Sequence, residues 1–124
     1  MIALVRRVTG PLLWWTGQVA VLEVPGRRTG TPRRVTLFPI EVDETRYLVS
    51  QYGISEWVRN LRAVDRARLS RKGQAEDITA VEIDGPERDQ VIAAYLAKLG
   101  GLRRDFDALP AIDDHPTFRV EPIR

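Results

Sequence analysis

Residues 26–34 combine positive charge with backbone freedom in a way that suits binding of an anion. They read Gly-Arg-Arg-Thr-Gly-Thr-Pro-Arg-Arg, with four arginines among nine residues. Guanidinium groups bind phosphate and carboxylate oxygens through paired N–H donors, and glycine lets the backbone approach a ligand closely. The segment therefore predicts a site for an anionic ligand. The alternative is a basic loop that is only solvated.

Strand-forming sequences flank this segment on both sides. Residues 19–24 and 35–40 are rich in valine, leucine and isoleucine, and the segment between them contains glycine, proline and threonine. Two such runs joined by a short turn-forming loop are typical of a β-hairpin. We therefore expect the arginines at the tip of a hairpin.

The rest of the chain predicts further strands and two helices. Apolar residues at helical spacing indicate a helix over residues 54–63, with Ser55 as N-cap, and another over residues 86–99. Further strands are expected over residues 46–51, 67–71, 75–83 and 117–120. Strands that follow one another closely, with few helices between them, indicate an α+β fold built on an antiparallel barrel. One domain is expected over residues 1–124, with a helical or apolar segment at 1–16.

Two motifs in this order resemble the deazaflavin (F420)-dependent nitroreductase family. The first is Gly-Arg-Arg-Thr-Gly-Thr-Pro-Arg after a hydrophobic strand, and the second is the strand and turn at residues 47–53 followed by a Trp-Val-Arg-Asn-Leu-Arg-Ala helix. The resemblance covers residues 19–83. It implies a small antiparallel split β-barrel, similar to flavin mononucleotide (FMN)-binding proteins, with flanking helices. It also implies the cofactor F420, a deazaflavin with a phosphate and a polyglutamate tail.

The resemblance assigns roles to individual residues. Three arginines match positions that hold the phosphate and tail, and two loop residues match positions that donate hydrogen bonds or permit close approach: Arg27, Arg28 and Arg33, with Thr29 and Gly30. The turn Ser50, Gln51, Tyr52 and Gly53 matches the border of the deazaflavin ring, and Trp57 and Asn60 match helix positions at the cofactor. Phe38 stands where many members have tyrosine.

Alternatives remain open at several of these positions. Trp57 also lies on the apolar face of its helix, which favours core packing, whereas Asn60 lies off that face and is expected to make a polar contact rather than be buried. Tyr52, Ser50 or solvent can protonate the product. Gln51 and Tyr52 replace a more usual Lys-Gly pair, and the tyrosine-rich stretch of the nitroreductases is absent at residues 99–106.

The implied reaction is hydride transfer from reduced F420 to a small organic acceptor such as an activated alkene, a quinone or a nitro compound. FMN is the alternative cofactor, because its phosphate would also suit the arginines. A protein that binds F420, a flavin or another anion without catalysis is the alternative function, and the departures around the ring favour it.

Composition limits other chemistries. The chain has no cysteine and a single histidine, His115, so no disulfide, thiolate nucleophile or Cys/His metal site is predicted, and His115 is expected to be structural. A net charge of +2 argues against a nucleic-acid-binding protein. No apolar run is long enough to span a membrane, so a cytoplasmic protein is expected. Residues 1–15 are basic, apolar and end in two tryptophans, which suits a membrane surface, packing on the barrel, or the core of a partner subunit in a homodimer.

Overall fold

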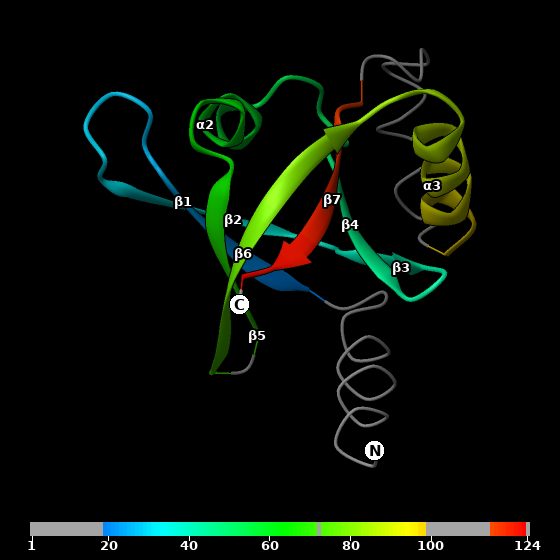
Figure 1. The fold of residues 1–124 in the computed structure, drawn as a ribbon, viewed down its shortest axis with the longest axis horizontal. Helices are drawn as coiled ribbons and strands as arrows, with labels where there is room; N and C mark the ends of the chain where they lie inside the picture. Colours follow the sequence, from blue (N-terminus) through cyan, green and yellow to red (C-terminus); the bar gives the residue numbers. More distant parts are fainter. Residues whose placement is uncertain (1–18, 72, 99–114, 124) are drawn as a thin grey trace.

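A single curled antiparallel sheet organises the protein, whose computed structural model describes residues 19–71, 73–98 and 115–123. The strands of this part of the chain are β1 (Ala20–Pro25), β2 (Pro32–Leu37), β3 (Ile40–Val42), β4 (Thr45–Val49), β5 (Arg66–Arg71), β6 (Gln74–Ile83) and β7 (Thr117–Pro122). Its helices are α2 (Glu56–Val64) and α3 (Gly85–Lys98). Figure 1 shows α2 beside the tip of the β1–β2 hairpin and α3 against the opposite flank of the sheet.

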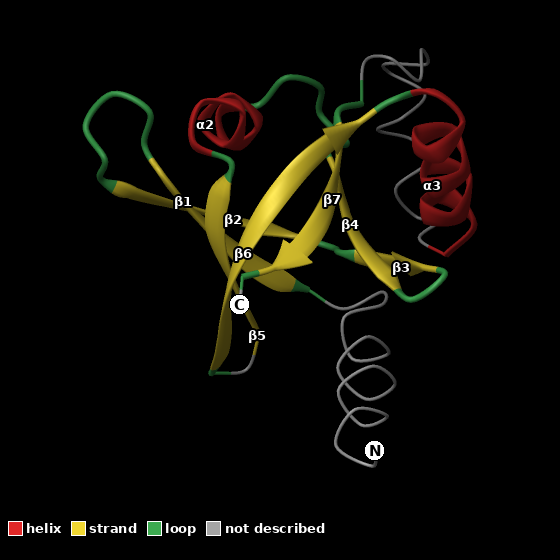
Figure 2. Ribbon diagram, viewed as in Figure 1, coloured by secondary structure: helices red, strands yellow, loops and turns green. Residues whose placement is uncertain are grey.

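The strand order is β2-β1-β5-β6-β7-β4-β3, and each of these neighbours pairs antiparallel. β7 lies between β6 and β4, so it joins the four strands on one side to the two on the other. Figure 2 shows that the sheet curls into a half-barrel, with α2 at one end beside the hairpin tip and α3 against one flank. The predicted α+β antiparallel fold is confirmed.

The core inside the half-barrel follows from the period-2 alternation of the strands. On β1 the alternating residues Ala20, Leu22 and Val24 are buried, and on β5 Leu69 is fully buried. Helix α2 adds Val58 and Leu61 to the same cluster. This helix is therefore fixed by its apolar face, which also fixes its polar face against the hairpin tip.

A second core lies between the sheet and α3. Val91, Ile92 and Tyr95 of α3 are buried against Tyr47 and other residues of the sheet. β4 serves both cores, because its residue Leu48 belongs to the half-barrel cluster while its neighbours belong to the α3 cluster. This is why Tyr47, Leu48 and Val49 are buried consecutively rather than alternately.

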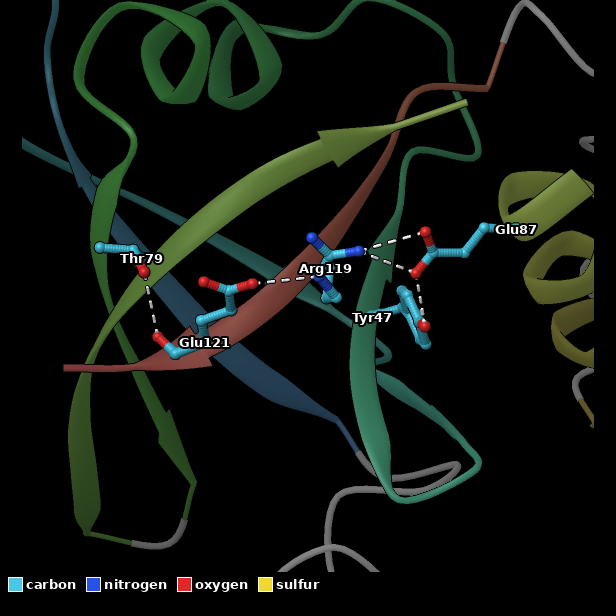
Figure 3. A network of polar contacts seen from close by, with 5 residues as sticks. All are labelled: Tyr47, Thr79, Glu87, Arg119 and Glu121. Carbon is cyan, nitrogen blue, oxygen red and sulfur yellow. Dashed lines mark hydrogen bonds and ion pairs between the residues drawn. The ribbon is translucent and has the colours of Figure 1, made fainter. Parts of the chain in front are cut away.

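Polar contacts also hold α3 to the sheet (Figure 3). The Tyr47 hydroxyl donates to Glu87 Oε2 at 2.9 Å, and Arg119 donates to both Glu87 oxygens at 3.0 and 3.1 Å. Arg119 also donates to the Glu121 carboxylate at 3.1 Å. The backbone carbonyl oxygen of Glu121 accepts a hydrogen bond from the Thr79 hydroxyl at 3.3 Å. Burial, together with the bond to Glu87, raises the pKa of Tyr47 from 10.0 to about 12. The same bond and Arg119 lower the pKa of Glu87.

Some predicted boundaries were wrong. The strand expected at residues 35–40 is two strands, because β2 ends at Leu37 and β3 begins at Ile40; Pro39 between them has no N–H to donate to a ladder. The first predicted helix begins at Glu56, and Ile54 is 52% exposed instead of lying on its apolar face. The strand expected at 46–51 ends at Val49. No described helix is long and apolar enough to cross a membrane. The predictions for residues 1–16 and 99–106 lie outside the described residues.

Candidate anion-binding pocket

A cavity of about 600 Å³ lies between the tip of the β1–β2 hairpin and α2. It is lined by Gly26, Arg27, Arg28, Thr29, Arg33, Arg34, Val35, Ser55, Glu56, Trp57 and Asn60. The hairpin contributes four arginines to this lining, and the start of α2 contributes Glu56, Trp57 and Asn60. We call this cavity the arginine pocket.

The hairpin tip has a defined backbone that orients its arginines. The ladder continues to the pair Pro25 and Pro32, and beyond it Gly26 N–H donates to the Thr31 carbonyl while Gly30 N–H donates to the Gly26 carbonyl, both at 2.8 Å. Gly30 has a φ of 78°, which favours glycine. At Gly26 a Cβ atom would lie 3.1 Å from the Thr31 carbonyl oxygen. The two glycines therefore permit this tight tip.

Arg27 connects the tip to α2. Its backbone N–H donates to Asn60 Oδ1 at 3.1 Å, and its Nη1 donates to the same oxygen at 2.9 Å. Nη1 also lies 3.0 Å from Glu56 Oε1. Asn60 makes the polar contact expected of it, but it is only 3% exposed, so the prediction that it would not be buried was wrong. It is buried because the hairpin tip covers it.

Glu56, which lines the pocket, lies between two arginines. Besides Arg27 it pairs with Arg59, one turn along the helix, at 3.2 Å. The hydrogen bond from Arg27 and the charge of that guanidinium, with a smaller effect of Arg59, lower the pKa of Glu56. The carboxylate is therefore charged at neutral pH, and it balances part of the positive charge of the pocket.

The remaining arginines of the pocket differ in their partners. Arg34 donates to Glu23 at 3.1 Å, a pair on the surface of the hairpin. Arg28 and Arg33 are exposed, and neither forms an ion pair within residues 19–71, 73–98 and 115–123. Their guanidinium groups are the ones available to an anion from solution.

Trp57 contributes an apolar wall. It is half-buried, lines the pocket, and packs on Phe118 with ring centroids 5.8 Å apart and an interplanar angle of 52°. It therefore belongs both to the edge of the half-barrel core and to the pocket surface. The core packing considered for it is therefore confirmed, and its contact with the cofactor stays a prediction.

The turn after β4 has one buried, hydrogen-bonded residue, Ser50, and one exposed residue, Tyr52. Ser50 is 2% exposed, its N–H donates to the Pro116 carbonyl at 2.9 Å, and its carbonyl oxygen lies 2.9 Å from His115 Nδ1. The Ser50 hydroxyl donates to the Gly53 carbonyl. Tyr52, by contrast, is 68% exposed. His115 is thus a buried support of the turn, as its expected structural role requires.

The structure brings together about half of the residues that the resemblance assigned to the cofactor. Those in the arginine pocket are Arg27, Arg28, Thr29, Arg33, Trp57 and Asn60, and those outside its lining are Gly30, Phe38, Ser50, Gln51, Tyr52 and Gly53. Gln51 accepts a hydrogen bond from Tyr95 of α3 at 3.1 Å, and Phe38 packs against the α3 core. The turn meets the pocket lining at Ser55, whose N–H donates to the Gly53 carbonyl at 2.9 Å and whose hydroxyl oxygen lies 3.4 Å from that of Ser50.

Sequence reasoning missed Glu56 as a pocket residue. A signal was present, because Glu56 and Asn60 are four residues apart and so share one side of a helix. Gly26, Arg34, Val35 and Ser55 also line the pocket without having been predicted there.

Comparisons with solved structures place the chain among split barrels. A structure described as F420-H2 Dependent Reductase (FDR-A) is 21% identical with a TM-score of 0.65, and the alignment covers 83% of this chain and 93% of that one. A structure described as a domain-swapped dimer is 20% identical with a TM-score of 0.66, covering 97% and 98%. HutZ, the heme storage protein of Vibrio cholerae, is 17% identical with a TM-score of 0.70, covering 94% and 90%. At these identities the likeness shows the fold, and the predicted split barrel is confirmed.

No curated protein sequence matches the chain significantly. A protein-family model, however, matches most of its length. Residues 2–103 match the family described as F420H(2)-dependent quinone reductase, a span that includes the whole hairpin, α2 and the turn between β4 and α2. This span also contains the two motifs that resemble deazaflavin-dependent nitroreductases. The chain therefore belongs to the F420H2-dependent quinone reductase family.

Proposed function

We propose that this protein binds F420 through the arginine pocket and reduces a small organic acceptor, with quinones as the first class to test. The observation that carries the proposal is the pair of exposed arginines, Arg28 and Arg33, which line a cavity of about 600 Å³ without a carboxylate partner among the described residues. Family membership supports the choice of cofactor and of acceptor.

The residues of the pocket fit the chemistry of the cofactor. F420 carries a phosphate and carboxylates, and arginine binds both through charge-assisted hydrogen bonds. Trp57 and Val35 supply apolar surface beside the charged groups. Gly26 also lines the pocket, where a Cβ atom would lie 3.1 Å from the Thr31 carbonyl oxygen, so glycine suits this position.

Reduced F420, when bound, supplies the hydride chemistry. The protein then has to bind the cofactor, orient the acceptor and protonate the product. Arg28 and Arg33 would bind the anionic end, and the hydrogen bonds of Arg27 to Asn60 would hold the hairpin at a fixed distance from α2. Of the two proposed proton donors, Tyr52 is exposed, whereas the Ser50 hydroxyl is buried and donates to Gly53. Tyr52 is therefore the better candidate to hold a proton for the product.

The test is titration of the purified protein with F420 and with FMN, followed by oxidation of reduced F420 with a soluble benzoquinone. We expect F420 to bind more tightly than FMN and the quinone to be reduced. The oxidation assay is repeated with a nitro compound and with an activated alkene. If F420 binds but none of the three acceptors oxidises it, a non-catalytic binding protein is favoured instead. Absence of binding at low ionic strength would reject the proposed function.

The assembly state is a separate proposal. One structural neighbour is described as a domain-swapped dimer, which supports testing this chain for a homodimer by sedimentation at several concentrations. A cytoplasmic location and contact of residues 1–15 with a membrane surface likewise remain proposals. The second can be tested by co-sedimentation with anionic vesicles.

A further inference from the structure

The arginine pocket contains one acidic residue among the described residues that line it. Glu56 lies 3.0 Å from Arg27 Nη1 and 3.2 Å from Arg59 Nη1, while Arg28 and Arg33 lie on the same cavity without such a partner. The charge of Glu56 opposes the binding of an anion to this cavity. Its presence there calls for a function other than attraction of the ligand.

In the ion pair between Glu56 and Arg27, the carboxylate is exposed and the guanidinium is held in place by another residue. The Glu56 side chain is 70% exposed, whereas that of Arg27 is 26% exposed and is held by Asn60. Ion pairs with an exposed partner contribute little free energy, because water competes for both groups. The carboxylate can therefore move into solvent while the guanidinium keeps its position.

We infer that Glu56 determines specificity by acting as an internal competitor for the anionic part of the ligand. It occupies the Arg27 guanidinium until an anionic group of the ligand replaces it. This inference rests on the proposed function, in that the pocket receives the anionic end of the ligand. A ligand with a single phosphate is satisfied by Arg28 and Arg33, so it gains little from Arg27. A ligand with more anionic groups has to displace Glu56.

A purely structural role for Glu56 makes the opposite prediction. The residue lies in the first turn of α2, where a carboxylate is stabilised by the helix dipole, and it pairs with Arg59 three residues later. If stabilising the helix were its whole role, Glu56→Gln would lower stability and leave affinity unchanged or reduced. Internal competition predicts that the same variant is slightly less stable but binds anions more tightly.

The experiment compares Glu56→Gln with Glu82→Gln in the full chain. Glu82 is a matched control, because it pairs with Arg62 of the same helix at 2.8 Å and lies outside the lining of the pocket. Binding of inorganic pyrophosphate, FMN, and F420 with short and long tails is measured by calorimetry at low and high ionic strength. Thermal unfolding of each variant is recorded in parallel.

We expect Glu56→Gln to bind long-tailed F420 roughly two- to fivefold more tightly than the wild type, the range for an exposed ion pair. The gain should be smaller for FMN and should shrink at high ionic strength, where exposed charges are screened. Glu82→Gln should bind like the wild type. An affinity of Glu56→Gln equal to that of Glu82→Gln, or a loss of affinity together with stability, would overturn the inference.

The two proposals can fail separately. If F420 binds and is oxidised but Glu56→Gln shows no gain, the inference fails and the proposed function stands. If F420 does not bind, but pyrophosphate binds more tightly to Glu56→Gln than to the wild type, the proposed function fails. The inference that Glu56 competes with anions for Arg27 then stands. If Glu56→Gln binds none of these anions at low ionic strength, both are rejected.

Discussion

The side-chain oxygen of Asn60 accepts two hydrogen bonds from Arg27, one from the backbone N–H at 3.1 Å and one from Nη1 at 2.9 Å. The two residues are 33 positions apart in the chain, so these bonds fasten the hairpin tip to α2. Arg27 is therefore a positioning residue of the pocket as much as a source of charge. Of the arginines that line the pocket, Arg28 and Arg33 are those without an ion-pair partner among the described residues.

Replacing Asn60 with alanine should destabilise the protein. The Arg27 N–H would lose its acceptor in a partly buried position, which costs about 1–3 kcal/mol of unfolding free energy. F420 affinity should fall as well, because the tip would no longer be held against the helix. Urea unfolding measures the first effect and calorimetry the second. Asn60→Asp, which keeps an acceptor, should lose less stability than Asn60→Ala; equal losses would argue against the role of these bonds.

Replacing Arg28 or Arg33 with alanine should weaken F420 binding. The expected loss is about 1.5–3 kcal/mol for each, the range for a hydrogen bond to a charged group. Arg66→Ala is the control, because Arg66 is exposed on β5 outside the pocket lining. Affinity should also fall with added salt and with a shorter tail. Normal binding by a variant with Arg27, Arg28 and Arg33 all changed to alanine would reject the pocket as the binding site.

Tyr52 is predicted to limit the size of the acceptor. It is 68% exposed at the end of the turn, so Tyr52→Gly should admit bulkier acceptors while F420 affinity changes by less than about tenfold, roughly 1.4 kcal/mol. Steady-state rates with a series of quinones of increasing size measure the effect. Ile54→Ala, which removes an exposed apolar side chain two residues later, should leave the acceptor range unchanged.

Tyr52→Phe tests proton transfer separately. A positioned general acid contributes roughly 10²–10⁴-fold to a rate. We expect a smaller loss, because water can replace an exposed hydroxyl. If Tyr52→Phe keeps the full rate and Tyr52→Gly keeps the acceptor range, the turn at residues 50–53 lies outside the active site.

Tyr47 should make stability depend on pH in alkaline solution. Its pKa is 10.0 in an unperturbed side chain and about 12 in the folded protein, so above pH 10 the unfolded chain loses this proton first. Ionisation then favours unfolding, and a stabilisation of at most about 3 kcal/mol, present below pH 10, is lost between pH 10 and 12.

The measurement for Tyr47 is urea unfolding of the wild type and of Tyr47→Phe from neutral to alkaline pH. At neutral pH the variant should be less stable, because Glu87 loses a donor at 2.9 Å. The difference between the two proteins should narrow as the pH rises above 10. A difference that stays constant over this range would show that the hydroxyl does not titrate as proposed.

Local patterns were enough to predict most elements of the fold. The alternation along β1 and the spacing of Val58 and Leu61 on α2 depend on neighbouring residues, so they are visible in the sequence. The position of β7 between β6 and β4 is not, because it depends on pairing between strands far apart in the chain. The second core under α3 depends on the same long-range pairing.

For the site, the sequence predicted the kinds of residues present but not the contacts between them. The arginines and glycines of the hairpin predict an anion site, but nothing local separates Arg27, which is bonded to Asn60, from Arg28, which has no such partner in the described part of the chain. That difference arises only where the tip meets α2. The sequence also could not show that Ser50 is enclosed beneath His115, since the two are 65 positions apart.

The central place of β7 has a consequence for how the chain acquires its structure during synthesis. β7 follows all the other described strands in the chain, yet it supplies the ladder partners of both β6 and β4. Until residues 117–122 emerge from the ribosome, the β2-β1-β5-β6 unit and the β4-β3 hairpin have no strand to connect them, and their unpaired edges are open to other chains. Long-range pairing of this kind slows folding and prolongs exposure to aggregation. A ribosome-stalled chain ending before β7 should therefore be protease-sensitive and bound by chaperones.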